Sequence, residues 1–455
     1  MKENDRDNLA SQFSSPQSGC GVAILGFGTV GQSVATILSE RSNTGLRLTH
    51  VLNRNLERKK VDWLPSAVRL TEDIKEIISS DANIVVELMG GLQPAEDWIR
   101  QALAAGKSVV TANKQLIARS GPQLVTLAHQ NGQELYYGAS VAGGVPVISG
   151  LQNGLAGDEL FLVRGILNGT CNYILSKMES QKVSFSEALQ EAQKLGFAEA
   201  DPTEDVDGLD ARAKLTILAR IGLHRSVAPE EIAVQSIRRI EAIDFEYANQ
   251  LGCTIRQISR AELKPGSENA ASRAEERPDQ HETLLLASVG PALVELSSPL
   301  ARVEGSQNLV ATTGTYGGET TFGGHGAGGH PTAVAVVSDI LAIARAKCDT
   351  KSNSKSTVET TPTEKSPQVS NDFVSKHYLR FFVRDQPGII AALATALSKC
   401  AINIDAVLQM PGHPSTRLPF LITLQECQTS LVERALEQIN NLDFMVEPCL
   451  HIPIL

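Results

Sequence analysis

Residues 20–40 read CGVAILGFGTVGQSVATILSE and indicate the class of protein to which the chain belongs. A short apolar run of buried-strand type, Cys20 to Leu25, leads directly into a GxGxxG turn, and Gln32 to Glu40 has helical character. This order is typical of a dinucleotide site, where glycines let the backbone approach a pyrophosphate and the helix N-terminus faces its charge. A glycine turn without a ligand is the alternative. The residues expected to contact the cofactor are Gly26, Phe27, Gly28, Thr29, Val30 and Gly31.

The end of the second expected strand, Arg47 to Leu52, should distinguish NAD from NADP. An acidic residue at this point would bind the 2′-hydroxyl of NAD. The sequence instead has Asn53 and Arg54, with three more basic residues by position 60. Because basic side chains suit a 2′-phosphate, we expect NADP, with NAD as the alternative cofactor and a merely solvated turn as the alternative explanation of the charges.

Further buried strands are expected at Ile84 to Leu88 and Ser108 to Thr111. Ligands bind beyond the carboxyl ends of parallel strands, so Lys114, which follows the second of these strands, would share a crevice with the dinucleotide. A solvated lysine is the alternative. After a strand at Leu135 to Ser140, the small residues of VAGGVP at 141–146 expose backbone carbonyls that can bind a hard cation, unless the segment is only a close-packed turn.

A second candidate site lies in Gly196 to Arg220, GFAEADPTEDVDGLDARAKLTILAR. Its first half predicts an acidic loop and its second half a helix. On that helix Asp210 and Lys214 are one turn apart and lie within the apolar stripe marked by Ile217 and Ile221. Burying two charges is costly unless they are paired and useful, so we favour an active site over a solvated pair or a purely structural buried pair.

Glycines are also dense in FGGHGAGGHP at 322–331, and such a loop can approach a ligand closely. We expect Gly326 to contact the cofactor. His325 and His330 are either catalytic or simply solvated loop histidines.

Composition argues against several classes of protein. The chain has 455 residues and a formal net charge of −10, and it lacks a basic strip with aromatic residues, which argues against nucleic-acid binding. It has neither an apolar run long enough for a membrane span nor a secretory leader pattern. Seven scattered cysteines without a CxxC pair indicate reduced thiols in the cytoplasm. Small molecules and further copies of the chain, as a homodimer or homotetramer, are the expected partners.

The expected fold class is α/β, with three folded domains. The last one has the βαββαβ order of a ferredoxin-like module. In chain order we expect a disordered tail at 1–18, a Rossmann-type NAD(P)-binding domain at 19–150 completed by a helix at about 331–347, an α+β catalytic and dimerisation domain at 151–330, a linker at 351–372 and the ferredoxin-like module at 373–455.

Together these motifs resemble homoserine dehydrogenase with a C-terminal ACT domain. GFGTVG, TANK, ASVAGGVP, NGTCNY, GFAEADPTEDVDGLDARAKL and GHGAGGHPTA occur in the order of that family, and the resemblance covers nearly the whole chain after residue 19. It implies reversible reduction of L-aspartate 4-semialdehyde to L-homoserine with NADPH or NADH, on the route to threonine, isoleucine and methionine.

The resemblance also implies residue roles. Lys114 and Lys214 would be the catalytic lysines, and Asp210 would hold the substrate together with Glu199 and Asp205. From the helical spacing we expect Asp210 also to orient Lys214, which we prefer for the proton transfer, although the sequence leaves the choice between the two lysines open. The residues that would bind or border the substrate are Glu199, Asp205, Gly169 and Thr170. The carbonyls that would bind sodium or another monovalent cation are those of Val141, Gly143 and Val145.

Three positions depart from the family pattern. Gly138 stands where many members have a glutamate that also contacts the cation, and Phe197 stands where a tyrosine is frequent. His325 replaces a residue that is commonly proline.

The C-terminal module resembles ACT domains in its βαββαβ order and in the turn Asp385-Gln386-Pro387-Gly388. The backbone of this turn commonly helps to bind an amino-acid effector, so the expected regulatory residues are Asp385, Pro387 and Gly388, with L-threonine as the leading effector. The usual polar pair after the third strand is absent, which leaves the effector open and makes a role in subunit assembly the alternative.

Two other functions remain open at this point. One is a non-catalytic nucleotide-binding regulator that senses an amino acid. The other is a different enzyme on the same architecture, such as an amino-acid dehydrogenase that deaminates aspartate. Turnover of aspartate semialdehyde with either dinucleotide distinguishes the three functions.

Overall fold

A computed structural model describes residues 19–41, 44–54, 61–264, 284–349 and 367–455. The expected tail at 1–18 and most of the expected linker lie outside these residues. None of the helices in the described stretches combines the length and the apolar character that crossing a membrane requires. Contacts divide the chain into two compact units, one of residues 1–150 and 325–363 and the other of residues 151–324 and 364–455.

The first unit is built on a parallel six-stranded sheet with the order β3-β2-β1-β4-β5-β6. Its strands are β1 (Cys20–Leu25), β2 (Leu46–Leu52), β3 (Arg69–Thr71), β4 (Ile84–Glu87), β5 (Ser108–Thr111) and β6 (Leu135–Tyr136). The main helices are α2 (Thr29–Glu40), α3 (Ile74–Ile78), α4 (Ala95–Ala104), α5 (Lys114–Gln130) and α12 (Gly329–Asp349).

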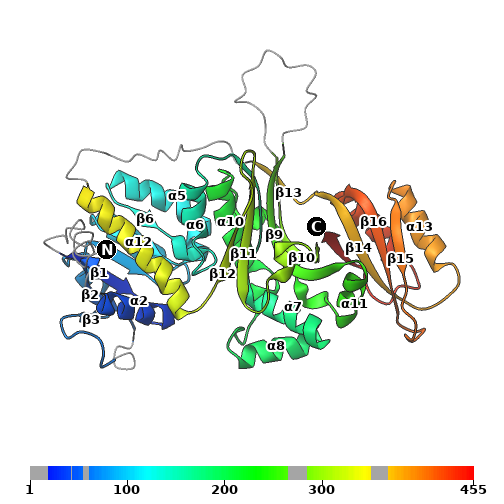
Figure 1. Cartoon of the computed structure of the whole chain (residues 1–455), viewed down its shortest axis with the longest axis horizontal. Coiled ribbons are helices and arrows are strands. Elements are labelled where there is room, and N and C mark those ends of the chain that lie inside the picture. Colours follow the sequence, from blue (N-terminus) through cyan, green and yellow to red (C-terminus); the bar gives the residue numbers. More distant parts are fainter. Residues whose placement is uncertain (1–18, 42–43, 55–60, 265–283, 350–366) are drawn as a thin grey trace, which may run out of the picture. The chain divides into compact units, whose positions relative to one another are not determined.

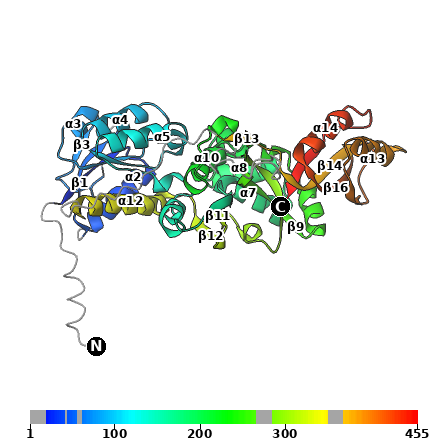
Figure 2. The ribbon, with the colours of Figure 1, turned by 90° about the horizontal axis from the view of Figure 1, so that it is seen from above.

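Helices cover both faces of this sheet. Figure 2 shows α3, α4 and α5 on one face and α2 and α12 on the other. Because both faces are covered, Val22 to Leu25 and Ile84 to Val86 are fully buried. Strands buried on both faces have continuous apolar sequences, as these two do. The expected Rossmann-type fold is confirmed, and its strand order reverses between β1 and β4.

The second unit contains a mixed sheet in which the described strands follow the order β12-β11-β7-β9-β10-β17-β14-β16-β15, with β8 and β13 also paired to β10 (Figure 1). These strands are β7 (Leu160–Ile166), β8 (Ala233–Val234), β9 (Cys253–Lys264), β10 (Leu284–Glu295), β11 (Gln307–Gly314), β12 (Gly318–His325), β13 (Gln368–Ser370), β14 (Val374–Val383), β15 (Ile404–Leu408), β16 (Leu418–Gln428) and β17 (Leu450–Ile454). Its helices include α7 (Gly169–Gln181), α8 (Phe185–Lys194), α9 (Thr203–Val206), α10 (Leu209–Gly222), α11 (Ala242–Gln250), α13 (Ile389–Lys399) and α14 (Thr429–Ile439).

The expected βαββαβ order of the C-terminal module is confirmed by β14, α13, β15, β16, α14 and β17. Two details differ from the sequence expectation. Residues 368–370, at the end of the expected linker, form β13 beside β10. The last strand was expected from Met445 to His451, whereas β17 runs from Leu450 to Ile454.

Buried charges connect this module to α11. Arg380 on β14 lies 3.4 Å from Asp244 (Nε to Oδ1) and 3.1 Å from Glu241 (Nη1 to Oε1). Tyr378 Oη donates to Asp244 Oδ1 at 2.6 Å, and Tyr247 Oη donates to the carbonyl of Pro419 at 3.2 Å. The module is therefore part of the second unit's packing and not only a neighbour along the chain.

Candidate active site

The acidic stretch folds into two helices separated by a glycine. Gly208 lies between α9 and α10 with a left-handed φ of +82°, and a Cβ there would also lie 3.2 Å from the Val289 side chain. Asp210 is in the first turn of α10, where the partial positive charge of the helix N-terminus favours a carboxylate. The turn at Gly208 thus decides where Asp210 and the residues after it point.

Asp210 and Lys214 form a buried ion pair. Lys214 Nζ donates to Asp210 Oδ2 at 2.6 Å and to the carbonyl oxygen of Leu167 at 2.7 Å. The Lys214 side chain is 14% exposed and the Asp210 side chain 8%, so the burial predicted from the helical spacing is confirmed. An ammonium group has three donors, and these two contacts occupy two of them.

Asn168 joins this pair to a second carboxylate. Its Nδ2 donates to Asp205 Oδ1 at 2.7 Å and to Asp210 Oδ2 at 2.9 Å. Its Oδ1 accepts from the backbone N–H of Cys171 at 2.8 Å and so caps α7, which begins with Gly169. Asn168 is not among the residues predicted from the sequence, although an asparagine directly before a helix is a recognisable N-cap signal.

The remaining substrate candidates lie around this cluster. Thr170 Oγ1 donates to the carbonyl of Phe197 at 2.7 Å, and the Phe197 ring packs against Tyr173 with centroids 4.8 Å apart. Glu199 is exposed, and Gln193 Nε2 holds its backbone carbonyl at 3.0 Å. The structure therefore brings Asp205, Asp210 and Lys214 together and leaves Glu199 on the exposed loop.

In the first unit, sterics require glycine at two positions of the turn after β1. A Cβ on Gly26 would lie 2.7 Å from the Leu88 carbonyl oxygen, and one on Gly31 would lie 2.1 Å from the Gly26 carbonyl oxygen. Around Gly28, by contrast, a Cβ would meet only open space, as expected if a ligand approaches that backbone.

The turn is tied to the end of β2. The Phe27 N–H donates to Asn53 Oδ1 at 3.1 Å, and the next residue, Arg54, is exposed. Asn53 therefore joins the glycine turn to the end of β2, one residue before Arg54. Lys114 follows β5 as the first residue of α5, with Asn113 as the N-cap of that helix.

The loop proposed for cation binding has an unusual backbone. Ala142 and Gly143 both have left-handed φ angles, +53° and +48°, and a Cβ on Gly143 would lie 2.2 Å from the Gly326 carbonyl oxygen. Gly326 is thus in contact with this loop. His325 and His330 are exposed, which favours the interpretation that they are solvated.

A partly buried carboxylate occupies the space beside Gly138. Asp339 Oδ2 accepts from the Gly138 N–H at 2.7 Å, and a Cβ on Gly138 would lie 2.8 Å from Asp339 Oδ1. Burial raises the pKa of Asp339 to about 7, and the hydrogen bond from Gly138 offsets this only in part. Gly138 stands out in the sequence, but its partner on α12 is 201 positions away and could not be predicted.

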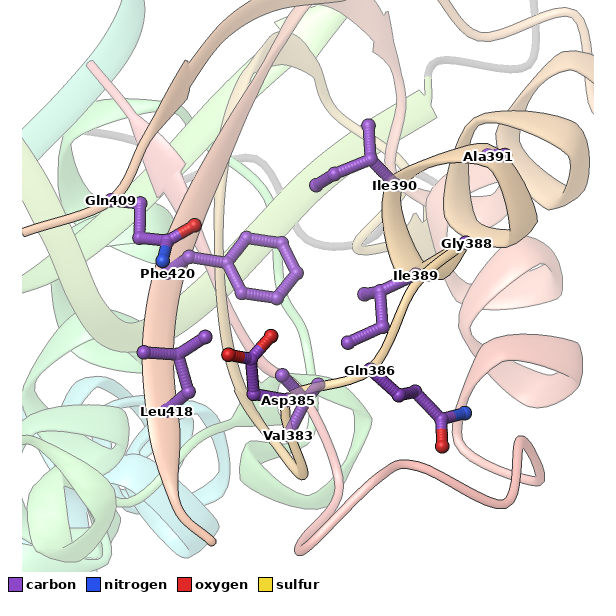
Figure 3. A pocket seen from close by; sticks show the side chains of 10 residues that line it. All are labelled: Val383, Asp385, Gln386, Gly388, Ile389, Ile390, Ala391, Gln409, Leu418 and Phe420. Atoms are coloured by element: carbon purple, nitrogen blue, oxygen red, sulfur yellow. The ribbon is translucent and has the colours of Figure 1, made fainter. Parts of the chain in front are cut away.

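The expected regulatory turn borders a cavity of about 360 Å³ in the C-terminal module (Figure 3). Gly388, with φ +95°, caps α13, and the Asp385 carboxylate points toward the space between Phe420 and the start of that helix. Most of the remaining lining is apolar and comes from Val383, Ile389, Ile390, Ala391 and Leu418. Gln386 and Gln409 are its polar members. Pro387 is not part of the lining.

Comparisons with known proteins agree across the chain. Residues 146–341 match the homoserine dehydrogenase family model, residues 26–138 its NAD binding domain, and residues 377–444 the ACT domain. Homoserine dehydrogenases of Synechocystis sp. and Bacillus subtilis are 37% and 35% identical; each alignment spans 94% of this chain, and the alignments span 97% and 96% of those proteins.

Solved structures give the same result. A homoserine dehydrogenase from Thiobacillus denitrificans superposes with a TM-score of 0.84 at 31% identity, covering 96% of this chain and 98% of that one. A hyperthermophilic archaeal homoserine dehydrogenase in complex with NADPH covers 72% of this chain and 98% of its own, with a TM-score of 0.58 at 27% identity.

Proposed function

We propose a mechanism for this chain from one premise: the chain belongs to the homoserine dehydrogenase family. It is an NAD(P)-dependent oxidoreductase that acts on a CH–OH group and interconverts L-aspartate 4-semialdehyde and L-homoserine. The observation that supports the mechanism most strongly is the buried Asp210–Lys214 pair beside Asn168 and Asp205.

Lys214 is our choice for the proton transfer. When bound, the dinucleotide supplies or accepts the hydride at the carbon that carries the oxygen. As the aldehyde is reduced, its oxygen needs one proton, and the Lys214 ammonium can donate it; in the reverse direction the neutral amine takes the proton back from the hydroxyl. Asp210 and the Leu167 carbonyl hold Nζ, which leaves the third donor of Lys214 for the substrate oxygen.

Other residues would bind the charged groups of the substrate. Asp205 and Glu199 suit its α-ammonium group, and Gly169 and Thr170, in the first turn of α7, suit an anionic or polar group. Lys114, in the first unit, is proposed as the second catalytic lysine and as a cation for the α-carboxylate.

NADP is the proposed cofactor. Exposed Arg54 directly follows Asn53, which contacts the glycine turn, and its guanidinium suits the 2′-phosphate that only NADP carries; the archaeal relative was solved with NADPH. Arg54→Ala should therefore raise the KM for NADPH by about tenfold and leave the KM for NADH nearly unchanged. Equal changes in both constants would remove Arg54 from this role.

We also propose a monovalent-cation site, sodium or a similar ion, at the carbonyls of Val141, Gly143 and Val145. The left-handed backbone at 142–143 and the partly buried Asp339 carboxylate beside Gly138 fit such an ion, because carbonyl and carboxylate oxygens are the ligands that hard cations take. Asp339 would supply the carboxylate that Gly138 lacks. Sodium or potassium chloride should then raise the Tm above its value in choline chloride, and Asp339→Asn should abolish that difference.

For the ACT module we propose feedback by an amino acid, with L-threonine as the leading effector. The Asp385 carboxylate suits an ammonium group, the N-terminus of α13 suits a carboxylate, and the apolar wall suits the methyl group of a small side chain. Inhibition should be tested with threonine, isoleucine, methionine and lysine. Gly388→Asp should blunt it by crowding the turn and repelling the effector carboxylate.

The activity is tested by following the absorbance of NADPH or NADH in the presence of aspartate semialdehyde. We expect turnover, faster with NADPH. No turnover with either dinucleotide would refute the function, and reduction of NAD⁺ or NADP⁺ by aspartate instead would support an amino-acid dehydrogenase.

A further inference from the structure

A buried carboxylate in the first unit has no role in the mechanism above. Glu87, the last residue of β4, has no exposed surface. Its Oε1 accepts from the backbone N–H groups of Met89 at 2.8 Å and Gly90 at 3.1 Å, and its Oε2 accepts from Thr111 Oγ1 at 2.6 Å. Glu87 therefore connects the loop after β4 to the last residue of β5.

Asn113 closes this set of contacts into a ring. Its backbone N–H donates to Thr111 Oγ1 at 3.0 Å, and its side-chain Nδ2 donates to the carbonyl oxygen of Gly91 at 2.6 Å. The Asn113 Oδ1 accepts from the Leu116 N–H at 3.2 Å, which caps α5 directly before Lys114. The ring thus fixes both the loop at 89–91 and the start of the helix that carries Lys114.

The ring lies at the place where a Rossmann sheet binds its ligand. Strand order reverses between β1 and β4, and ligands bind beyond the carboxyl ends of strands at such a switch point. The glycine turn packs directly against the segment after β4, since a Cβ on Gly26 would lie 2.7 Å from the Leu88 carbonyl oxygen. Gly90 and Gly91 have left-handed φ angles of +72° and +71°, so this loop holds a specific shape.

Glutamate suits the ring better than glutamine. A buried carboxylate is costly unless donors satisfy it, and three donors converge on Glu87. In a Glu87→Gln variant, one of the two terminal atoms would be an amide nitrogen, which accepts no hydrogen bond. If that nitrogen faced Thr111 Oγ1, the hydroxyl would lose the acceptor for its own proton.

We propose that Glu87 is a positioning residue for dinucleotide binding. Through Thr111 and Asn113 it holds the 89–91 loop and the start of α5 in the arrangement that binds NADPH and places Lys114. The inference rests on the proposed dinucleotide-dependent function, and it adds a residue that contacts neither the substrate nor the cofactor.

The test measures the Kd for NADPH by nicotinamide fluorescence. The titrations contain no substrate and are made at a temperature well below the Tm of the wild type and of each variant. We expect Glu87→Gln and Thr111→Val to weaken binding by roughly tenfold or more, because each leaves a buried partner unsatisfied. Thr111→Ser keeps the hydroxyl and should restore binding. Glu96→Gln, which breaks only a surface pair with Arg100 on α4, is the matched control and should bind as wild type.

The outcomes separate the two claims. Weaker NADPH binding in Glu87→Gln and Thr111→Val, with binding restored in Thr111→Ser, supports the positioning role. If Glu87→Gln does not fold, the comparison of Thr111→Val with Thr111→Ser is sufficient for the test. Variants with a lowered Tm but wild-type NADPH affinity would show that the ring only stabilises the fold, and the inference would be wrong. If wild type binds neither NADPH nor NADH, the proposed function fails and the inference fails with it.

Discussion

Two buried ion pairs of the second unit differ in what surrounds them. Lys214 and Asp210 lie one turn apart on α10, with Asn168 and Asp205 beside them, and Lys214 keeps 14% of its side chain exposed. Arg380 and Asp244 come from β14 and α11 and are 1% and 0% exposed. An ion pair that exchanges protons with a ligand needs one N–H donor that the protein does not occupy. An ion pair that only joins two elements is most stable when the protein satisfies all of its polar groups.

The Arg380–Asp244 pair also has several further contacts. Besides Asp244, Arg380 contacts Glu241 and Glu447, and its guanidinium lies over the Phe382 ring, 4.4 Å from the centroid. Burial raises the pKa of Asp244 to about 6, against the opposing effect of Arg380. We therefore expect changes in the first pair to affect turnover and changes in the second to affect stability.

The largest effect is expected for Lys214→Ala. Loss of the proton-transfer group should lower kcat by about 10²- to 10⁴-fold, with the fold retained. Lys177→Ala is a matched control, because Lys177 is also mostly buried and pairs with Glu191 at 2.6 Å on the same unit. Steady-state kinetics measure kcat, and circular dichroism shows whether the variant is folded. Near-normal turnover in a folded Lys214→Ala protein would refute the role of Lys214 in proton transfer.

Arg380→Met should mainly lower stability. Removing the cation leaves the fully buried Asp244 carboxylate without its charge partner, which we expect to cost about 3–5 kcal/mol of the free energy of unfolding. Denaturant titration measures the loss, and kcat at low temperature should remain close to wild type. Arg100→Met, at a surface pair, should change stability by less than about 1 kcal/mol. A loss of turnover without a loss of stability would reverse the roles given to the two pairs.

Asp244→Asn should remove a specific pH dependence. Because the folded-state pKa of Asp244 is raised above 3.8, the protonated form is favoured in the fold. Its contribution to stability is fully present below pH 3.8 and is lost as the pH rises through about 6. Between pH 4 and 6 the wild type should therefore lose roughly 2–3 kcal/mol relative to the variant. Parallel stability curves for the two proteins would contradict the raised pKa.

The smallest effect is expected for Glu199→Gln. Glu199 is exposed on the loop before α9, so Glu199→Gln should raise the KM for aspartate semialdehyde by about tenfold while kcat changes little. Initial rates at varied substrate concentration measure both constants. A loss confined to kcat would mean that Glu199 acts on the chemical step.

The features that could be predicted from the sequence are local. The GxGxxG turn between strand and helix and the spacing of Asp210 and Lys214 each depend on a few adjacent residues, so periodicity identifies them. Contacts between distant residues depend on topology. Asn168 reaches Asp210 across 42 positions and Gly138 meets Asp339 across 201, and no local pattern indicates either contact.

Strand pairing sets the same limit. The C-terminal module was predicted from its element order, but β13 depends on pairing with β10, far away in the sequence. The Arg380–Asp244 pair was missed for this reason as well, since β14 and α11 each look ordinary alone. Glu87 reads as the end of a buried strand, and only its three hydrogen bonds show that its carboxylate is used.

The central claim is that Asp210 acts through Lys214, and a double-mutant cycle on kcat tests it most directly. The cycle compares wild type, Asp210→Asn, Lys214→Ala and the double variant under saturating substrate and NADPH. The account predicts that Asp210→Asn lowers kcat in the wild-type background and has no further effect once Lys214 is alanine. Losses that multiply in the double variant would show two independent contributions and would contradict the account.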